Sequence, residues 1–134
     1  MIELIKIAKI KNADSLDSWN IGFQIAPRIN AAGRMNHANT AFALLISKDN
    51  DEAEKLAKEL DFNNQMRQKS TVAIFEGVEA QLAKNNQASL LSAVYEYSEG
   101  EEYKPWNEGI IGLVSGRVTE KYYRQSLIIT KTDE

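Results

Sequence analysis

Two arginines frame a run of small residues in the first third of the chain. Residues 27–34 read PRINAAGR, with Arg28, Asn30 and Arg34 as the polar side chains. Small side chains let a ligand approach the backbone, and a guanidinium offers a planar fork that suits phosphate. The segment predicts a phosphate contact from a loop or turn over residues 29–35. Considered on physics alone, a tight loop between helices, with arginines paired to nearby carboxylates, is the favoured alternative.

A second candidate lies nearer the C-terminus. Residues 106–117 read WNEGIIGLVSGR, which places a glycine-bearing turn before a predicted helix. The N–H groups at a helix N-terminus bind anions, and Ser115 and Arg117 follow on the second turn, with Asn107 just ahead of it. The alternative is that the glycines only allow close packing between helix and sheet. The pattern matches neither a Rossmann fingerprint nor a P-loop.

The sequence predicts no catalytic and no metal-binding residue. His37 is the single histidine and cysteine is absent, so disulfides and thiolate metal sites are excluded. The carboxylates of residues 49–54 fit the solvated start of a helix rather than a metal cluster. Trp19, Tyr103 and Trp106 offer rings for base stacking, although core packing or turn anchoring is the favoured interpretation of each.

Charge and hydropathy limit the kinds of partner. The net charge is −3, with six Lys/Arg against three Asp/Glu in residues 1–48 and an acidic excess in the rest. Any phosphate contact must therefore come from a few placed arginines and not from a basic surface. No apolar run approaches the ~20 residues that span a bilayer. We expect no membrane association and a cytoplasmic location.

The elements that position these candidates follow from hydrophobic spacing. Helices are predicted over residues 37–46 and from Asp49 to about residue 85, the second opened by a capping box of Asp49 and Glu52. Its two ends carry apolar stripes, and polar residues 63–68 lie between them. An exposed, solvated middle between apolar ends predicts a helix that bridges two bodies.

The last part of the chain predicts a strand, a helix and a strand, over residues 90–97, 109–123 and 126–132. This order implies a parallel pair with a right-handed crossover. Because two strands alone make a barely stable sheet, we expect an incomplete βαβ unit from a truncated domain, and self-association through an exposed sheet edge.

Three segments in order resemble patterned regions of the RecJ exonucleases. They are IGFQIAPRINAAGRM at residues 21–35, NQMRQ at residues 64–68, and WNEGIIGLVSGRVTEKYYRQSLII at residues 106–129. No single segment is specific, but their order and spacing agree over nearly the whole chain. The resemblance implies membership of the DHH phosphoesterase superfamily.

The resemblance also implies an α/β (α+β) architecture in three parts. Residues 1–48 would be the helical end of the DHH catalytic domain, with the PRINAAGR loop. Residues 49–86 would form the long connecting helix, and residues 87–134 part of the DHH-associated substrate-binding domain. The aspartates and histidines that bind Mn²⁺ or Mg²⁺ in the family fall outside this sequence, so no cofactor is expected in the fragment itself.

The implied function is 5′→3′ hydrolysis of single-stranded DNA in repair and recombination, with this fragment inactive alone. Arg28 and Arg34 match arginines of the family's motif, and Ser115 and Arg117 match positions that hold the 5′ end of the strand. Asn107 replaces a family histidine, which puts that histidine's role in doubt here. Two alternatives stay open: a non-catalytic nucleic-acid- or nucleotide-binding module of the DHH superfamily, and a purely structural interaction domain.

Overall fold

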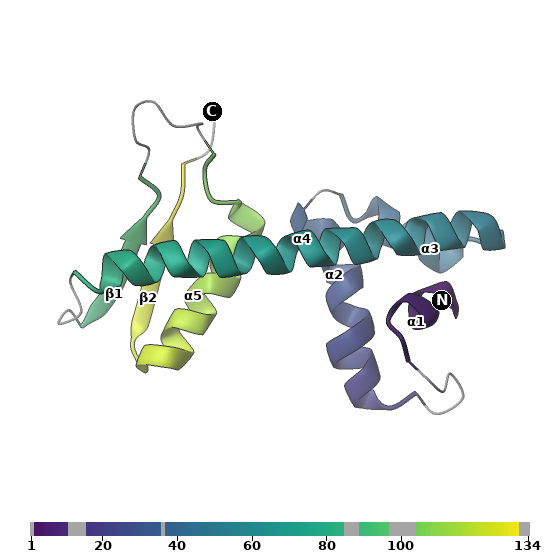
Figure 1. The fold of residues 1–134 in the computed structure, drawn as a ribbon, viewed down its shortest axis with the longest axis horizontal. Helices are drawn as coiled ribbons and strands as arrows, with labels where there is room; N and C mark the ends of the chain where they lie inside the picture. Colours follow the sequence, from purple (N-terminus) through teal and green to yellow (C-terminus); the bar gives the residue numbers. More distant parts are fainter. Residues whose placement is uncertain (1, 11–15, 36, 85–88, 97–103, 132–134) are drawn as a thin grey trace. The chain divides into compact units, whose positions relative to one another are not determined.

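The chain divides into two compact units that share one long helix. A computed structural model describes residues 2–10, 16–35, 37–84, 89–96 and 104–131 (Figure 1). The units are Met1–Arg67 and Gln68–Glu134, and the boundary falls inside α4, which spans Asn50–Leu82. One continuous helix, as expected, thus connects two bodies. The division into domains 1–48, 49–86 and 87–134 stays a prediction.

The first unit is entirely helical in the residues described. It contains α1 (Ile2–Ile7), the π-helix η2 (Asn20–Ile25), α2 (Ala26–Met35), α3 (Asn39–Ile46) and the first half of α4. Each element contributes apolar side chains to one core, which comprises Leu4, Ile5, Ile25, Ala32, Ala41, Leu44, Ala53, Ala57 and Leu60. Several of these residues are alanines, whose small side chains let helices approach closely.

The PRINAAGR segment is helical, so the expected loop over residues 29–35 is wrong. Helical backbone runs from residue 18 through η2 into α2, and Pro27 does not break it. The N–H of Ala26 donates to the carbonyl of Ile21, five residues back, which is the wide spacing of a π-turn. A wide turn just before Pro27 relieves the clash that a proline ring makes with the preceding helical turn. Gly33 has no positive φ and serves no turn.

The start of α4 carries the predicted cap in modified form. The Asp49 carboxylate accepts the N–H of Glu52 at 2.9 Å, as an N-cap requires. The Glu52 carboxylate accepts the hydroxyl of Ser47 at 2.5 Å, whereas a capping box would have it accept the N–H of Asp49. The cap satisfies backbone donors that would otherwise be free at the start of this helix.

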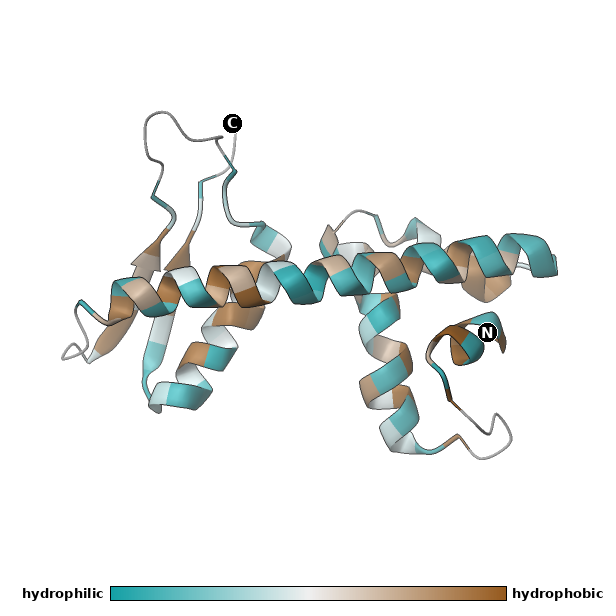
Figure 2. Cartoon of the chain, viewed as in Figure 1, coloured by the Kyte–Doolittle hydropathy of each residue, from teal (hydrophilic) through white to brown (hydrophobic). Residues whose placement is uncertain are grey.

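The second unit packs a parallel pair of strands on two helices. It contains the second half of α4, β1 (Leu90–Val94), α5 (Glu108–Tyr122) and β2 (Gln125–Ile129). Leu90 pairs with Gln125 and Val94 with Ile129, in parallel register. The predicted strand–helix–strand order and the α/β class are confirmed. In Figure 2 the two strands carry much of the brown, apolar colouring of this unit.

One face of this sheet is buried and the other is exposed. Alternate residues Leu91, Ala93 and Ile128 are buried, as period-2 side-chain alternation requires. The core of the unit also contains Ile74, Val78, Leu82, Ile110, Val114 and Val118. On the opposite face, four apolar side chains are exposed: Leu90, Val94, Leu127 and Ile129.

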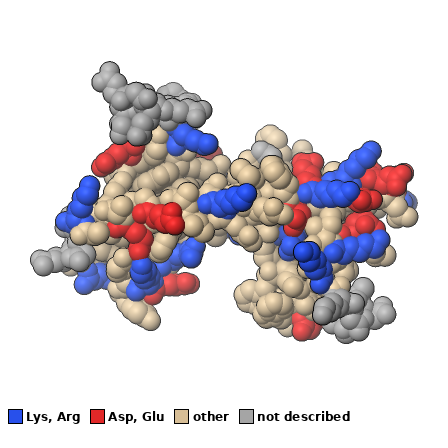
Figure 3. All heavy atoms as spheres, viewed as in Figure 1, with Lys and Arg blue, Asp and Glu red and all other residues tan. Residues whose placement is uncertain are grey.

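Charged side chains of both signs are interspersed over the face seen in Figure 3. No extended basic field appears on that face, in keeping with the acidic composition. Among the residues that the structure describes, no helix is both long and apolar enough to cross a membrane.

Candidate nucleic-acid interface

Arg28, near the start of α2, is held by an internal ion pair. Its Nε donates to Oδ1 of Asp61 on α4 at 2.8 Å, and its Nη1 donates to the carbonyl of Gln24 at 2.6 Å. Both side chains of the pair are less than a fifth exposed, at 18% and 19%. Gln65 donates to the other oxygen of Asp61 at 2.7 Å. The pairing with a carboxylate of the long helix, expected as the alternative to phosphate contact, is what the geometry shows for this arginine.

Arg34, in the last turn of α2, has a different neighbour. It lies close enough to Arg67 of α4 for the two positive charges to interact. Burial lowers the pKa of the Arg67 guanidinium, and the charge of Arg34 lowers it further. A guanidinium nonetheless stays protonated at neutral pH. This end of α2 therefore places two positive charges together, while Asn30, one turn earlier, is exposed.

The polar middle of α4 is solvated only in part, because Asn63 and Asn64 are buried whereas Gln65 and Gln68 are exposed. Asn63 is 5% exposed and Asn64 is 3% exposed. The Oδ1 atom of Asn64 accepts a hydrogen bond from Nη2 of Arg67 at 2.9 Å. In the part of the chain that the structure describes, Nδ2 of Asn63 is buried and donates to no acceptor. Donors thus predominate among the polar groups at this position.

Sequence reasoning missed Asn63 and Arg67 as functional candidates, although a signal was present. The buried stripe of α4 includes Leu60 and Ile74. Steps of three or four residues from Leu60 reach Asn63 or Asn64, then Arg67. These polar residues therefore lie in the register of a buried face, where a polar side chain requires a partner.

The N-terminus of α5 is closed by its own cap. The Oδ1 atom of Asn107 accepts the N–H of Gly109 at 2.9 Å. The Asn107 carbonyl accepts the N–H groups of Ile110 at 2.9 Å and Ile111 at 3.1 Å. Two of the four N–H groups that a helix start leaves free, those of Gly109 and Ile110, thus have internal acceptors. An N-cap role explains why an asparagine suits this position.

Ser115 and Arg117 lie on different sides of α5. The Ser115 hydroxyl is 3.1 Å from the carbonyl oxygen and 2.8 Å from the hydroxyl of Ser126 in β2. The guanidinium carbon of Arg117 lies 4.9 Å from the ring centroid of Phe75 on α4. Residues two apart are rotated by about 200° around a helix. The structure does not bring these two side chains to one point.

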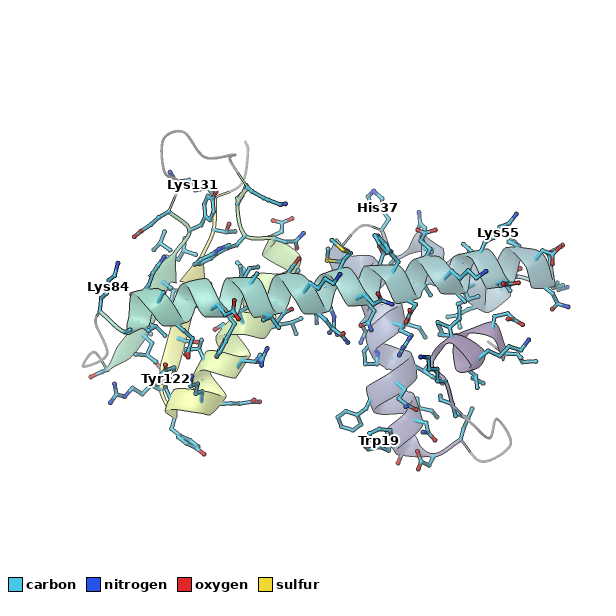
Figure 4. The ribbon with its side chains drawn as sticks, in the orientation of Figure 1. Trp19, His37, Lys55, Lys84, Tyr122 and Lys131 are labelled. Carbon is cyan, nitrogen blue, oxygen red and sulfur yellow. The ribbon has the colours of Figure 1, made fainter. Side chains whose placement is uncertain are left out.

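In the last turn of α5, a network of charged and polar side chains joins α5 to α4. The Glu79 carboxylate accepts hydrogen bonds from Lys121 and, at 2.6 Å, from the hydroxyl of Tyr122, which Figure 4 labels. Burial alone would raise the pKa of Glu79, but the hydrogen bonds from Lys121 and Tyr122 and the lysine's charge hold it below its usual value. This hydrogen-bond network connects α4 and α5 within the second unit.

The two described tryptophans differ in environment. Trp19, labelled in Figure 4, is 56% exposed and stacks on Phe23 with 5.8 Å between ring centroids. Core packing is therefore the wrong interpretation of Trp19. Trp106 is partly buried, lies edge-on to Tyr95, and accepts the Thr130 hydroxyl at its carbonyl, which fits an anchored turn. Tyr103 lies outside the described residues.

Metal-binding side chains do not cluster in the part of the chain that the structure describes. No group of three or more His, Asp or Glu that could hold an ion occurs among the described residues. His37, labelled in Figure 4, is exposed. The arrangement offers hydrogen-bond donors and positive charge, which bind anions, and no set of oxygen and nitrogen ligands that would hold a divalent cation.

Comparison with known proteins finds similar sequences of one kind. No family model matches the chain. The chain is 33% identical over 132 residues to the single-stranded-DNA-specific exonuclease RecJ of Bacillus subtilis, covering 98% of this chain and 16% of that protein. RecJ of Haemophilus influenzae is 32% identical over 136 residues, covering all of this chain and 23% of that protein.

A solved structure gives the same answer for the fold. The crystal structure of exonuclease RecJ bound to manganese superimposes with a TM-score of 0.78 at 26% identity, covering 94% of this chain and 29% of that one. The chain thus spans less than a third of each of these proteins. In sequence and in fold, it matches a part of the RecJ family of single-stranded-DNA-specific exonucleases.

Proposed function

We propose that this chain is part of a 5′→3′ single-stranded-DNA exonuclease of DNA repair and recombination, in the cytoplasm, and that it contributes contacts to DNA phosphates. The observation that carries the proposal is a match to RecJ proteins along nearly the whole of this chain, with a TM-score of 0.78 to the manganese-bound structure. The match includes both arginine-bearing segments, so the candidate contacts lie within the shared region.

Hydrolysis itself would belong to residues outside this chain. The described residues do not fit a metal centre, because no three potential ligands gather. We propose that the parent protein uses Mn²⁺ or Mg²⁺ held elsewhere, and that this chain binds and positions the strand. Arginine and asparagine side chains are suited to that role, since they donate hydrogen bonds and phosphodiester oxygens only accept them.

The proposed contacts are Arg28, Asn30, Arg34, Asn107, Ser115 and Arg117. Their environments rank them. Arg34 has a cationic neighbour, and Asn30 and Arg117 are exposed. Arg28, Asn107 and Ser115 already hold internal hydrogen bonds, so a phosphate would have to compete with Asp61, with a backbone N–H or with Ser126. We expect the first group to contribute more to affinity.

An activity and binding assay tests the proposal. Purified chain is incubated with 5′-labelled oligothymidylate and Mn²⁺, and binding is followed by fluorescence anisotropy at several salt concentrations. We expect binding that weakens steeply with salt, and no degradation. Degradation that scales with the chain after trace nucleases are removed would contradict the fragment's predicted inactivity. A chain that binds no strand at low salt would count for the purely structural alternative.

We also infer that the chain self-associates through its sheet. In the described residues, β1 and β2 pair only with each other, and their outer face exposes four apolar side chains. A strand edge with free backbone groups is a template for another strand. Sedimentation velocity at high concentration should show a dimer or a larger species. A strict monomer would overturn the inference.

A further inference from the structure

The middle of α4 buries an asparagine whose side-chain N–H groups are not satisfied within the described part of the protein. Asn63 is only 5% exposed, and its Nδ2 has no acceptor among the residues that the structure describes. A buried amide N–H that is left unsatisfied destabilises a folded protein. Asn63 and Arg67 are four residues apart, so they lie on the same face of the helix, one turn from each other.

The groups gathered at this face are predominantly donors. Arg67 and Arg34 contribute guanidinium N–H groups, and Asn63 contributes an amide N–H. Asn64 Oδ1, an acceptor within the cluster, is used by Nη2 of Arg67. What Nδ2 of Asn63 lacks among the described residues is an acceptor, and a phosphodiester group supplies acceptor oxygens that also suit guanidinium groups.

Burial of Arg67 and the like charge of Arg34 act on Arg67 in the same direction. Burial lowers the pKa of Arg67, and the nearby charge of Arg34 lowers it further, so both effects disfavour the charged state in which the side chain nevertheless exists. An anion placed between the two guanidiniums would reverse the repulsive contribution. The alternative is that the polar residues only join α2 to α4.

We propose that Asn63 and Arg67 of α4, together with Arg34 of α2, form one binding site for a phosphate of the single strand. This proposal rests on the proposed function, and it adds two residues of the long helix to the contacts. Asn63 would donate through Nδ2, and the two arginines would flank the phosphate. All three residues belong to the first unit.

The most informative variant is Asn63→Asp. The substitution keeps the size of the side chain and places a carboxylate where the phosphate would sit. It should raise the melting temperature by a few degrees, because the two guanidiniums gain an internal acceptor. It should also lower the affinity of the full chain for oligothymidylate about tenfold or more, because the site is filled.

The matched control is Gln68→Glu. Gln68 is exposed on the same helix, and this substitution changes the net charge by the same amount. We expect at most about a twofold change in affinity, the screened effect of one surface charge. Arg67→Lys adds a second test: the charge stays and the fork is lost, so affinity should fall while the salt dependence is retained.

Two probes separate the failure of the site from the failure of the proposed function. If oligothymidylate binds and Asn63→Asp weakens binding no more than Gln68→Glu, the site is refuted and the proposed function stands. If inorganic pyrophosphate binds in an Arg67-dependent way but oligothymidylate does not, the anion site stands and the proposed function fails. If the wild-type chain binds neither probe, both the phosphate site and the proposed function are refuted.

Discussion

The two ends of α2 place similar arginines in opposite environments. Arg28 meets the carboxylate of Asp61 and a backbone carbonyl, so its donors near α4 have acceptors within the protein. Arg34, six residues later, lies near the partly buried Arg67. Asn63, one turn before Arg67, has an amide nitrogen with no acceptor among the described residues. The first site pairs its arginine with a carboxylate, and the second brings two positive charges close together.

The difference shows why a motif with two arginines does not define two equivalent contacts. An arginine that holds a carboxylate stabilises the fold and must give up that partner to hold a phosphate. An arginine beside another arginine gains most when an anion arrives. The same distinction separates the capped start of α5, where the N–H groups of Gly109 and Ile110 already have acceptors, from a helix start that would be open to a ligand.

The largest effect on stability should come from breaking the balanced end. Arg28→Ala should lower the free energy of unfolding by about 2 kcal/mol, between the values for surface and buried ion pairs, because the pair with Asp61 is mostly buried. Urea unfolding measures this, and a double-mutant cycle with Asp61→Asn isolates the pair. A coupling energy near zero would mean that the Arg28–Asp61 ion pair does not stabilise the fold, and the contrast between the two ends of α2 would be lost.

At the other end, Arg34→Ala should reduce binding with little loss of stability. We expect affinity for oligothymidylate to fall about tenfold, with the slope of log affinity against log salt reduced by about one unit or slightly less. Anisotropy titrations at three salt concentrations give both numbers. If Arg34→Ala destabilises the chain as much as Arg28→Ala and leaves binding unchanged, the contrast between the two arginines is wrong.

The start of α5 should behave like the balanced end. Asn107→Ala removes the side-chain acceptor for Gly109 and should cost about 1 kcal/mol of stability, the usual loss for an N-cap. Asn107→Asp keeps the acceptor and should be tolerated. Thermal unfolding of both variants checks this, and equal loss from the two would mean that the cap does not hold this helix.

The smallest effect concerns acid. Because the folded-state pKa of Glu79 lies below its usual value near 4.5, its contribution to stability is present above about pH 4.5 and is lost as pH falls through the folded-state pKa. In an acid series, the stability advantage of the wild type over Glu79→Gln should shrink below that pH. A stability difference between the wild type and Glu79→Gln that stays constant down to pH 3 would show that the charge of the carboxylate does not stabilise the network between α4 and α5.

Much of the fold follows from local patterns in the sequence. Apolar spacing predicted α3, α4 and α5 within a few residues, and β-branched runs predicted both strands and their parallel order. The cap of Asp49 was legible because its signal is local. The helical PRINAAGR segment was missed, because proline and glycine usually end helices and nothing in the sequence announces a π-turn before Pro27.

The candidate site was harder to predict, since it depends on which helices meet. Arg28 finds Asp61 thirty-three residues away, and only the packing of α2 on α4 shows that Arg34 lies near Arg67. Polarity suggested that Asn63 and Asn64 face water, whereas they lie in the buried register of α4. In the second half of the same helix, the apolar Val72 is 48% exposed whereas Ile74 is buried, so apolar character alone does not identify the buried face.

The most direct test of the account is a titration of the ¹⁵N-labelled chain with 5′-phosphorylated oligothymidylate, observed at the arginine Nε–Hε signals. The account predicts that the signals of Arg34 and Arg67 shift most and that Arg28, whose Nε–Hε already donates to Asp61, shifts least. A largest shift at Arg28, or saturating strand with no arginine signal moved, would contradict it.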